Sequence, residues 1–393
     1  MAKPVNSGRA TRTADAVVIG GGVIGCAIAF RLAQQQVKVI VVDRAEPGSG
    51  ASSAAAGMIS PQGEMVEFGP FFELCAASRD LYAGFVEEIE SLTGESVGYG
   101  REGTLLVAPD EAAGGELEEV YRRQKDQGLP LERLAREAVL ERVPGLSPAI
   151  AGGLFLPGDH RVDNERLTPA LARAATRLGV TFLTHAAVTR LNVTSGRLQS
   201  VEVRADSAST ASTLSADCFV MAAGCWSSGL AAPLGIHLPM QPCRGQMIEF
   251  RSPAELPLIV RAGHHYLVPR APRRILAGTT AEFAGFEKEV TGEGLRSILE
   301  GVMRFAPSVK HLEFHRAWAG LRPDTADHLP ILGYGGIDGL IFATGHFRNG
   351  ILLAPVTAEL VSELVRTGST SRSIEDYRPT RFTAETAQRE TAR

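Results

Sequence analysis

Three glycines at the spacing Gly20-x-Gly22-x-x-Gly25 lie between a short apolar run and a helical pattern, and the next apolar run ends at Asp43. This arrangement is typical of a turn that binds a dinucleotide. Gly20 permits the tight turn, Gly22 lets the backbone approach a pyrophosphate at the helix N-terminus, and Gly25 lets the helix and the strand pack closely. Asp43 is expected to accept hydrogen bonds from the adenosine ribose. This cradle alone does not distinguish NAD from FAD.

A loop of small residues, 48–58, follows the second apolar run and is suited to carry backbone amides and hydroxyls along an extended cofactor. Taken alone, its composition fits a flexible loop equally well. A second strand-to-glycine turn lies at 222–226, and the two segments together resemble the anatomy of a flavoprotein. Met58 is a candidate to face the flavin, with packing against other side chains as an equal alternative. In addition to the cradle, we therefore expect the cofactor site to contain Val23, Ile24, Arg44, Ser52, Ser53, Ala55, Ala56, Gly57, Met58, Ala223, Gly224 and Trp226.

Two further segments make the resemblance specific. Residues 318–323 have the sequence Trp-Ala-Gly-Leu-Arg-Pro, and residues 345–355 have the sequence Gly-His-Phe-Arg-Asn-Gly-Ile-Leu-Leu-Ala-Pro. Together with the glycine motifs, they make residues 14–382 resemble the D-amino acid oxidase superfamily, and within it the glycine oxidases of the thiamine pathway. The resemblance implies an FAD enzyme of α/β class, α+β overall, with a discontinuous Rossmann-like FAD-binding domain and a substrate domain on an antiparallel sheet.

The resemblance also implies a substrate site. Such an enzyme moves a hydride from the substrate Cα to flavin N5, so no side chain has to act as an acid or a base. Arg322 is the best candidate to bind the substrate carboxylate, because a guanidinium matches a carboxylate through two hydrogen bonds. Family likeness places Tyr266 as a hydroxyl donor to the same carboxylate and Arg348 near the flavin and the substrate. His264 is a candidate for the pocket wall, with an ordinary polar role at a strand end as an equal alternative.

A helix that begins near Gly350 is expected to face the flavin, because its N-terminal amides and positive dipole end would stabilise negative charge on the reduced ring. Several relatives bind FAD covalently through a cysteine in the C-terminal half or through an early histidine. This chain has no cysteine after Cys243 and no histidine before His160, so we expect non-covalent FAD. The residues that this segment adds to the cofactor site are His346, Phe347, Arg348, Asn349, Gly350 and Ile351.

The cradle must be positioned by a β-α-β unit. The apolar runs 16–19 and 37–42 predict two buried parallel strands around a helix. Pro355 is tolerated in the last helix only if it lies in the first turn. Two strands at 188–203 predict a hairpin, and the Ala/Ser/Thr-rich segment 206–215 predicts an exposed loop at its edge. Further helices are predicted over 70–92, 167–179 and 351–366.

The predicted domains are discontinuous, as the resemblance implies. The residues assigned to the FAD-binding domain are 14–88, 152–236 and 316–382. Those assigned to the substrate-binding domain are 89–151 and 237–315, and the tails 1–13 and 383–393 are expected to be disordered.

The composition limits the possible partners. The 393 residues, 44% of them hydrophobic, are sufficient for two globular domains. With 40 basic and 44 acidic residues and no basic cluster, we expect no nucleic-acid partner. The apolar stretch 16–30 is too short and too rich in glycine to span a membrane, and we expect no export signal. The five cysteines are widely spaced, which fits the cytoplasm and predicts no metal site.

Three functions stay open at this point. The favoured one is oxidation of glycine and other small amines by oxygen. The second is an amino acid dehydrogenase that passes electrons to a partner, as in a cyanide-synthase-like subunit or a D-amino acid dehydrogenase. The third is a flavin-bound assembly subunit without catalysis, which the presence of Tyr266, Arg322 and Arg348 disfavours because a scaffold needs no carboxylate clamp. A homo-oligomer, a tetramer by family likeness, is expected.

Overall fold

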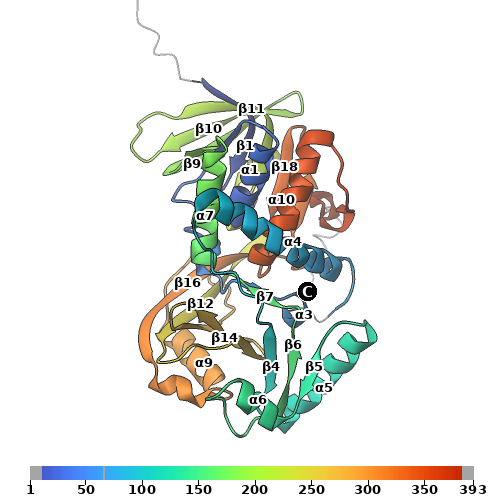
Figure 1. The fold of residues 1–393 in the computed structure, drawn as a ribbon. Helices are drawn as coiled ribbons and strands as arrows, with labels where there is room; N and C mark the ends of the chain where they lie inside the picture. Colours follow the sequence, from blue (N-terminus) through green and yellow to red (C-terminus); the bar gives the residue numbers. More distant parts are fainter. Residues whose placement is uncertain (1–10, 65–66, 383–393) are drawn as a thin grey trace, which may run out of the picture.

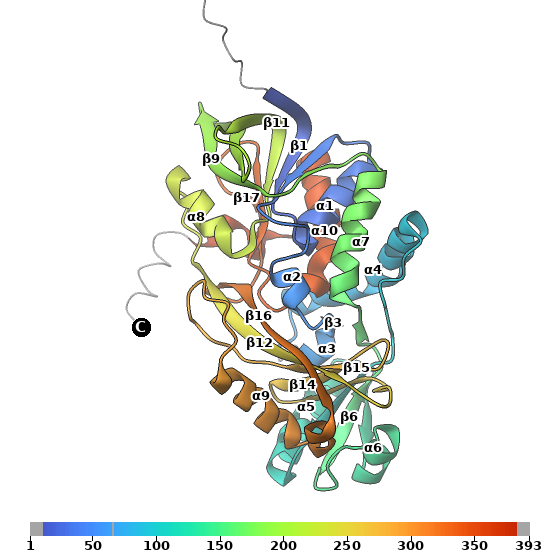
Figure 2. The same cartoon turned by 90° about the vertical axis from the view of Figure 1, so that its left-hand side faces the viewer.

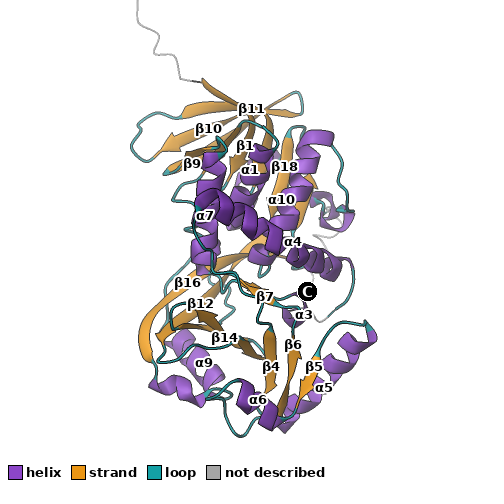
Figure 3. Cartoon of the chain, in the orientation of Figure 1, coloured by secondary structure: helices purple, strands orange, loops and turns teal. Residues whose placement is uncertain are grey.

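The structure, a computed structural model, describes residues 11–64 and 67–382 of the chain. Two eight-stranded sheets lie in two parts of an elongated molecule, the first above the second in Figure 1. The mixture of helices and sheets, distinguished by colour in Figure 3, confirms the predicted α/β class. Strand β1 (Thr11–Ile19) starts inside the predicted N-terminal tail, because its first residues pair with Thr213–Ala216. The predicted tail 383–393 lies outside the described residues.

The first sheet contains a parallel core. Its other strands are β2 (Val39–Val42), β8 (Thr181–Leu183), β9 (Ala186–Thr194), β10 (Arg197–Ala205), β11 (Ser212–Met221), β17 (Ile331–Tyr334) and β18 (Leu340–Thr344). The order is β17-β18-β11-β1-β2-β8, and all neighbours from β18 to β8 are parallel. In β1, Ala16 and Val18 face one apolar cluster while Val17 and Ile19 face another. Burial of both faces explains why the run is continuously apolar.

Helices cover one face of this sheet, as Figure 2 shows. They are α1 (Val23–Gln34), α7 (Asn164–Arg177) and α10 (Gly350–Thr367), and α4 (Pro70–Thr93) packs against α10 and α7. The N-terminus of α1 follows the glycine turn directly, and that of α10 follows the loop after β18. Both helix starts therefore lie at the carboxyl edge of the parallel strands, where ligands bind in folds of this kind.

Pro355 lies in the interior of α10, and its predicted place in the first turn is wrong. A proline removes one amide from a helix and so leaves a carbonyl without its partner. Here the carbonyl of Ile351 accepts a hydrogen bond from the Tyr82 hydroxyl at 2.6 Å, and the carbonyl of Leu352 accepts one from Ser78 Oγ at 2.6 Å. Two side chains of α4 thus satisfy the backbone around the proline and allow the helix to continue.

The hairpin is formed by β9 and β10, which pair from Thr194 and Arg197 onward as predicted. The predicted loop over 206–215 is only partly right, because only its first part is a loop. β11 starts at Ser212 and pairs with β10 on one side and β1 on the other. Small polar residues have little intrinsic preference for a strand, so pairing with two neighbours decides the conformation.

The second sheet is antiparallel except for one pair. Its strands are β4 (Thr104–Ala108), β5 (Glu132–Leu134), β6 (Gly152–Leu156), β12 (Met240–Arg251), β13 (Ile259–Ala262), β14 (His265–Arg270), β15 (Arg274–Gly278) and β16 (Glu313–Thr325). The order is β16-β12-β15-β14-β13-β4-β6-β5, with β13 and β4 parallel. Its own helices are α5 (Glu111–Asp126), α6 (Arg136–Arg142) and α9 (Gly292–Met303). Residues 152–156 and 316–325, assigned from sequence to the FAD-binding domain, pair within this second sheet.

Short elements connect the two parts. After the β-α-β unit come α2 (Ala51–Ala54), β3 (Met58–Ile59) and α3 (Pro61–Glu64), and β3 pairs with β7 (His160–Arg161). Helix α2 contacts both α7 and β16, so the small-residue loop touches both parts of the molecule. Within the described ranges, none of the helices combines the length and the apolar character that a membrane crossing needs.

Candidate active site

A cavity of about 550 Å³ is lined by residues of both sheets and of the loop between them. On the first sheet it lies at the carboxyl ends of β1, β2, β11 and β18. The predicted site residues that line it are Gly20, Gly22, Val23, Ile24, Asp43, Arg44, Ser52, Ala55, Ala56, Gly57, Met58, Ala223, Gly224, Trp226, Tyr266, Arg322, His346, Phe347, Arg348, Asn349, Gly350 and Ile351. Three predicted residues, Gly25, Ser53 and His264, do not line it.

Each glycine of the turn has a different environment. Gly20 has φ of 111°, and a Cβ there would collide with the carbonyl of Ala222. A Cβ at Gly25 would overlap the carbonyl oxygen of Gly20, so Gly25 permits the close approach of α1 to β1 and lies behind the cavity wall. At Gly22 a Cβ would meet only Ser52 Oγ, at 3.3 Å, on the cavity side. The backbone of Gly22 is therefore open to a pyrophosphate at the α1 N-terminus.

Asp43 holds the turn and lines the cavity. Its Oδ2 accepts a hydrogen bond from the Gly21 amide at 2.6 Å, and its Oδ1 accepts one from the Ala45 amide at 2.9 Å. Because each carboxylate oxygen can accept more than one bond, the group keeps capacity for ribose hydroxyls. Beside it, the Arg44 guanidinium lies 3.6 Å from the centroid of the Trp226 ring. Two residues that the sequence assigned to the cofactor thus form a cation–π pair in the cavity wall.

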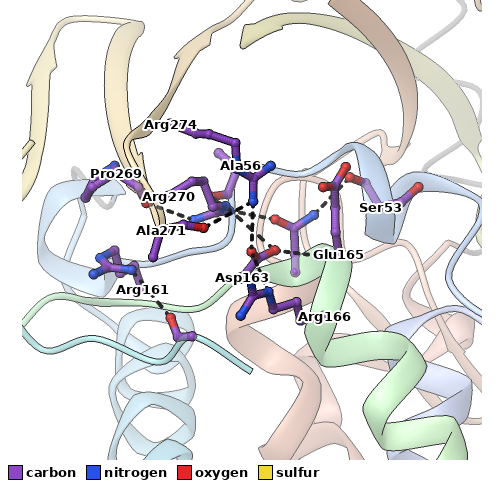
Figure 4. Close-up of polar contacts among 12 residues, drawn as sticks. Ser53, Ala56, Arg161, Asp163, Glu165, Arg166, Pro269, Arg270, Ala271 and Arg274 are labelled. Atoms are coloured by element: carbon purple, nitrogen blue, oxygen red, sulfur yellow. Dashed lines mark hydrogen bonds and ion pairs between the residues drawn. The ribbon is translucent and has the colours of Figure 1, made fainter. Parts of the chain in front are cut away.

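The small-residue loop is held from two directions, as Figure 4 shows. Arg270 of β14 is 2% exposed, and its Nη2 donates to the Ala56 carbonyl at 2.5 Å and to Asn164 Oδ1 at 2.7 Å. Asn164, the first residue of α7, donates through Nδ2 to the carbonyls of Ser52 at 2.8 Å and Ser53 at 3.0 Å. Ser53 therefore supports the loop through its backbone rather than facing the cavity.

The charge of Arg270 is balanced inside the protein. Burial lowers the pKa of Arg270 to about 10, and the nearby Asp163 opposes that shift. Asp163 Oδ1 lies 3.8 Å from Arg270 Nε, and Asp163 Oδ2 lies 3.7 Å from Arg274 Nη2. The guanidinium thus stays protonated at neutral pH, which a donor to the Ala56 carbonyl requires.

The second sheet supplies a phenol and a guanidinium to the cavity. Tyr266 of β14 is 3% exposed, and its hydroxyl donates to Met247 Sδ at 3.3 Å. Arg322 of β16 donates to the Thr280 carbonyl at 3.0 Å and to Thr279 Oγ1 at 2.8 Å, which fixes the guanidinium plane. Burial raises the pKa of Tyr266, although the charges of Arg322 and Arg348 lower it. The hydroxyl therefore keeps its proton and can donate to an anion near Arg322.

Arg348 is engaged by an acid that the sequence analysis did not assign. Glu64 Oε2 lies 3.0 Å from Arg348 Nη2, and Glu64 Oε1 accepts from Arg261 Nη1 at 2.6 Å. The side chain of Glu64 is only 10% exposed, and it lines the same cavity as Tyr266. The charge of Glu64 also contributes to the raised pKa of Tyr266, after the larger effect of burial. The only sequence signal for Glu64 is an acid shortly after the small-residue loop.

The start of α10 faces the cavity, and its amides have no side-chain cap from Asn349. His346 precedes it, is 3% exposed, and has Nε2 at 3.1 Å from Thr357 Oγ1. Burial lowers the pKa of His346 to about 3, so its ring is neutral at physiological pH. Positive character at this helix start therefore comes from backbone amides rather than from the histidine.

The structure favours the ordinary polar role for His264, and its place in the substrate pocket stays a prediction. It lies in the exposed turn between β13 and β14 and is absent from the cavity wall. The alternation that directs Tyr266 inward starts only with β14, so spacing from Tyr266 says nothing about a turn residue. Among the other cavity residues that the sequence analysis did not assign are Met247, Thr279 and Lys288, which belong to no motif.

These features define a dinucleotide-binding oxidoreductase of the two-sheet flavoprotein class. The residues present fit FAD. Gly22 leaves room for a pyrophosphate, Asp43 retains acceptors for a ribose, and the start of α10 and Tyr266 line the same cavity. In the described part of the chain, no cluster of His, Cys, Asp and Glu is suited to a metal ion.

Comparison with known proteins agrees with that class. The model of the FAD dependent oxidoreductase family matches residues 15–364. The glycine oxidase of Geobacillus kaustophilus is 33% identical over 380 residues, covering 94% of this chain and 98% of that protein. A crystal structure of glycine oxidase from the same species matches with a TM-score of 0.89 at 33% identity, covering 95% of this chain and 100% of that one. The chain therefore belongs to the FAD dependent oxidoreductase family.

Two further relatives are informative. The bifunctional protein ThiO/ThiG of Synechocystis sp. is 36% identical over 378 residues, and this chain, 94% of which is covered, spans 54% of that protein. A structure of iminodiacetate oxidase from Chelativorans sp. BNC1 matches with a TM-score of 0.83 at 27% identity, covering 93% of this chain and 98% of that one. With these relatives, the protein is an FAD-dependent amino acid oxidase by class, and its cofactor is FAD.

Proposed function

We propose that the protein oxidises glycine and other small amines, such as sarcosine and small D-amino acids. The product is an imine that hydrolyses to the 2-oxo acid and ammonia, or methylamine in the case of sarcosine, and the electrons pass to oxygen to give hydrogen peroxide. The observation that carries the proposal is that Arg322 and Tyr266 line the same cavity as the Gly22 cradle. Two hydrogen-bond donors for a substrate carboxylate therefore lie in the same cavity as the site for the redox cofactor. The likeness to glycine oxidases supports glycine as a substrate.

In this mechanism the protein binds and orients. FAD, when bound, supplies the hydride acceptor. Arg322 anchors the substrate carboxylate through its planar fork, which Thr279 and the Thr280 carbonyl hold in place. Tyr266 donates its hydroxyl to the same carboxylate. These contacts fix which Cα hydrogen faces the acceptor, and the α10 amides stabilise the negative charge that develops nearby.

The proposal extends to a metabolic role. Its support is the resemblance to thiamine-pathway glycine oxidases and the likeness to a protein that joins ThiO to ThiG. In that role the glycine imine would supply the thiazole ring of thiamine. We also propose a cytoplasmic homo-oligomer. The five cysteines are unpaired, and Phe283, Phe286 and Phe314 are 61%, 55% and 57% exposed, which offers apolar surface for contacts between subunits. Light scattering of the purified protein tests the assembly.

One experiment tests the chemistry and separates an oxidase from a dehydrogenase. The flavin is reduced anaerobically with a panel of glycine, sarcosine, D-alanine and L-alanine, and oxygen is then admitted. We expect bleaching by glycine and sarcosine and, on admission of oxygen, fast return of the yellow colour with one peroxide per flavin. Bleaching followed by slow reoxidation would favour a dehydrogenase with another electron acceptor. Absence of bleaching by every amine in the panel would contradict the proposed substrates.

A further inference from the structure

Glu64 is an internal carboxylate with both oxygens occupied. Its Oε2 lies 3.0 Å from Arg348 Nη2 and its Oε1 lies 2.6 Å from Arg261 Nη1. Arg261 of β13 also donates to the carbonyl of Gly63 at 2.6 Å, so the second sheet holds the backbone of α3 as well as the acid. The arrangement places a fixed negative charge in the cavity wall, close enough to raise the pKa of Tyr266.

The ion pair of Glu64 and Arg348 gives the two arginines of the cavity, Arg322 and Arg348, different roles. Arg348 already binds a carboxylate that belongs to the protein, whereas the partners of Arg322 are a carbonyl and a hydroxyl, both neutral. A substrate carboxylate that approached Arg348 would have to displace Glu64 from it, leaving Glu64 Oε2 without its ion-pair partner and Arg261 as the one arginine of the pair still bound to Glu64. Loss of one ion-pair contact of a largely buried carboxylate is unfavourable, and two carboxylates side by side repel each other as well. Arg322 is therefore the one of the two that accepts a substrate carboxylate without loss of an existing ion pair.

We propose that Glu64 is a specificity-determining residue that confines the site to amines with a single carboxylate. It does so by occupying Arg348, the guanidinium that a second substrate carboxylate would need. This inference rests on the proposed function, because it assumes an amine substrate bound through Arg322. The fold itself does not exclude dicarboxylates, since it is shared by an iminodiacetate oxidase. The exclusion must therefore come from side chains such as Glu64.

Two probes isolate the charge of the second group. Iminodiacetate and N-ethylglycine are both N-substituted glycines of similar length, and they differ chiefly in whether the N-substituent ends in a carboxylate or a methyl group. The quantity measured is the ratio of kcat/KM for N-ethylglycine to kcat/KM for iminodiacetate, from anaerobic flavin reduction at one pH and ionic strength. A ratio within one variant cancels general losses of flavin or stability. In the wild type we expect it to exceed roughly tenfold, because of like-charge repulsion at Glu64.

Three variants test the assignment. Glu64→Gln removes the charge at nearly constant shape and frees Arg348, so the ratio should fall by about tenfold or more, mainly through a lower KM for iminodiacetate. Glu64→Asp keeps the charge and should keep most of the discrimination. Glu67→Gln removes the same charge from an exposed neighbouring position and should leave the ratio at its wild-type value. That last variant controls for a change in net charge.

The outcomes distinguish this inference from the proposed function. If the wild type reduces its flavin with glycine but does not discriminate between the two probes, Glu64 does not set the charge class, and no variant is needed to show it. An unchanged ratio in Glu64→Gln also overturns the inference. A rise in KM for glycine in Glu64→Gln with no gain for iminodiacetate would assign Glu64 to the substrate ammonium instead. If the wild type reduces its flavin with no amine, the proposed function itself fails.

Discussion

Ser52 Oγ accepts a hydrogen bond from the Val23 amide at 2.9 Å, in the first turn of α1. The contact joins the small-residue loop to the glycine turn, two motifs that are separated in the sequence by helix α1 and strand β2. The Val23 amide, which has no partner within the helix, thus donates to an oxygen acceptor on the cavity side. A pyrophosphate offers acceptors of the same kind with more charge, and the N-terminus of a helix stabilises that charge.

The first prediction concerns Gly22. Gly22→Val should abolish FAD binding, because a branched side chain would project from the cavity wall at the closest approach of the backbone to the pyrophosphate. Asp43→Ala should be milder, since the loss is confined to hydrogen bonds. Flavin content per protein, read from the visible spectrum, measures both. Gly84→Val in α4, where a Cβ meets no atom within 4 Å, controls for substitution of a glycine. Equal flavin occupancy in Gly22→Val and the wild type would show that the cradle lies elsewhere.

The second prediction is that the FAD is not covalently attached. No cysteine follows Cys243 and no histidine precedes His160. All five cysteines of this chain lack a disulfide partner. Burial is the largest cause of the raised pKa of the Cys225 and Cys218 thiols. A protonated, buried thiol is a poor nucleophile for attachment. Acid precipitation should release the flavin into the supernatant with its full absorbance. Yellow colour that stays with the pellet would contradict this expectation.

Much of the cofactor cradle can be predicted from the sequence because its requirements are local. A tight turn with positive φ at Gly20 and close packing at Gly25 both require glycine, so the spacing alone reveals the turn. Arg322 and Tyr266 carry no such local signature, and it was the resemblance to a family that singled them out. The ion pair of Glu64 and Arg348 joins distant parts of the chain, so no spacing rule detects it.

The errors have a common physical origin. Ser212–Ser215 has the composition of a loop but forms a strand because β1 and β10 pair with it on both sides. Residues 152–156 and 316–325, assigned from the sequence to the FAD-binding domain, belong to the second sheet because β6 and β16 pair with strands of that sheet. In each case a tertiary contact overrides the local pattern.

The third prediction tests the support of the small-residue loop. Asn164→Ala removes the donors to the Ser52 and Ser53 carbonyls and one acceptor of Arg270. Each buried group left unsatisfied costs about 1–3 kcal/mol, so we expect FAD to bind roughly tenfold or more weakly. Flavin titration of the apoprotein measures the dissociation constant. Asn192→Ala in the hairpin removes a side-chain hydrogen bond far from the loop and should leave that constant unchanged. Equal constants for Asn164→Ala and the wild type would remove the network from the cofactor site.

The fourth prediction concerns Asp159, which is fully buried and whose pKa is raised to about 7 by that burial. In the unfolded chain the same carboxyl titrates near 4. Between about pH 4 and pH 7 the folded protein therefore binds a proton that the unfolded chain has released, and the contribution of Asp159 to stability falls as the pH rises through this window. Above about pH 7 the contribution of Asp159 to stability no longer changes with pH.

Asp159→Asn removes this titration while keeping one acceptor for the Gln62 and Gly63 amides, which donate to the carboxylate at 3.3 and 3.2 Å. The thermal midpoint of the wild type minus that of Asp159→Asn should decrease steadily from pH 5 to pH 7 and then level off. Because the comparison is a difference between two holoproteins, other titrating groups cancel to first order. A difference that does not change with pH would show that Asp159 is ionised in the folded protein throughout.

The fifth prediction concerns Arg322. Arg322→Ala should keep FAD bound but weaken substrate capture severely, since a hydrogen bond to a charged group contributes about 1.5–3 kcal/mol, or roughly ten- to a hundredfold in the half-saturating glycine concentration. Lysine should restore only part of this loss, because an ammonium cannot reproduce the planar fork that Thr279 and the Thr280 carbonyl align.

The rate at saturating glycine should decrease as well, because the clamp also fixes which Cα hydrogen faces the acceptor. Flavin reduction should still quicken with pH in Arg322→Ala, since the amine must be neutral to release a hydride whatever holds the carboxylate. Rapid-reaction measurement of flavin bleaching by glycine separates these effects. An unchanged half-saturation in Arg322→Ala would move the carboxylate anchor to Arg348, and that in turn would require Glu64 to leave its 3.0 Å contact with Arg348 when substrate binds. Binding of the substrate carboxylate at Arg322 leaves Glu64 in place, whereas binding at Arg348 displaces it. The Arg322→Ala variant distinguishes these two cases.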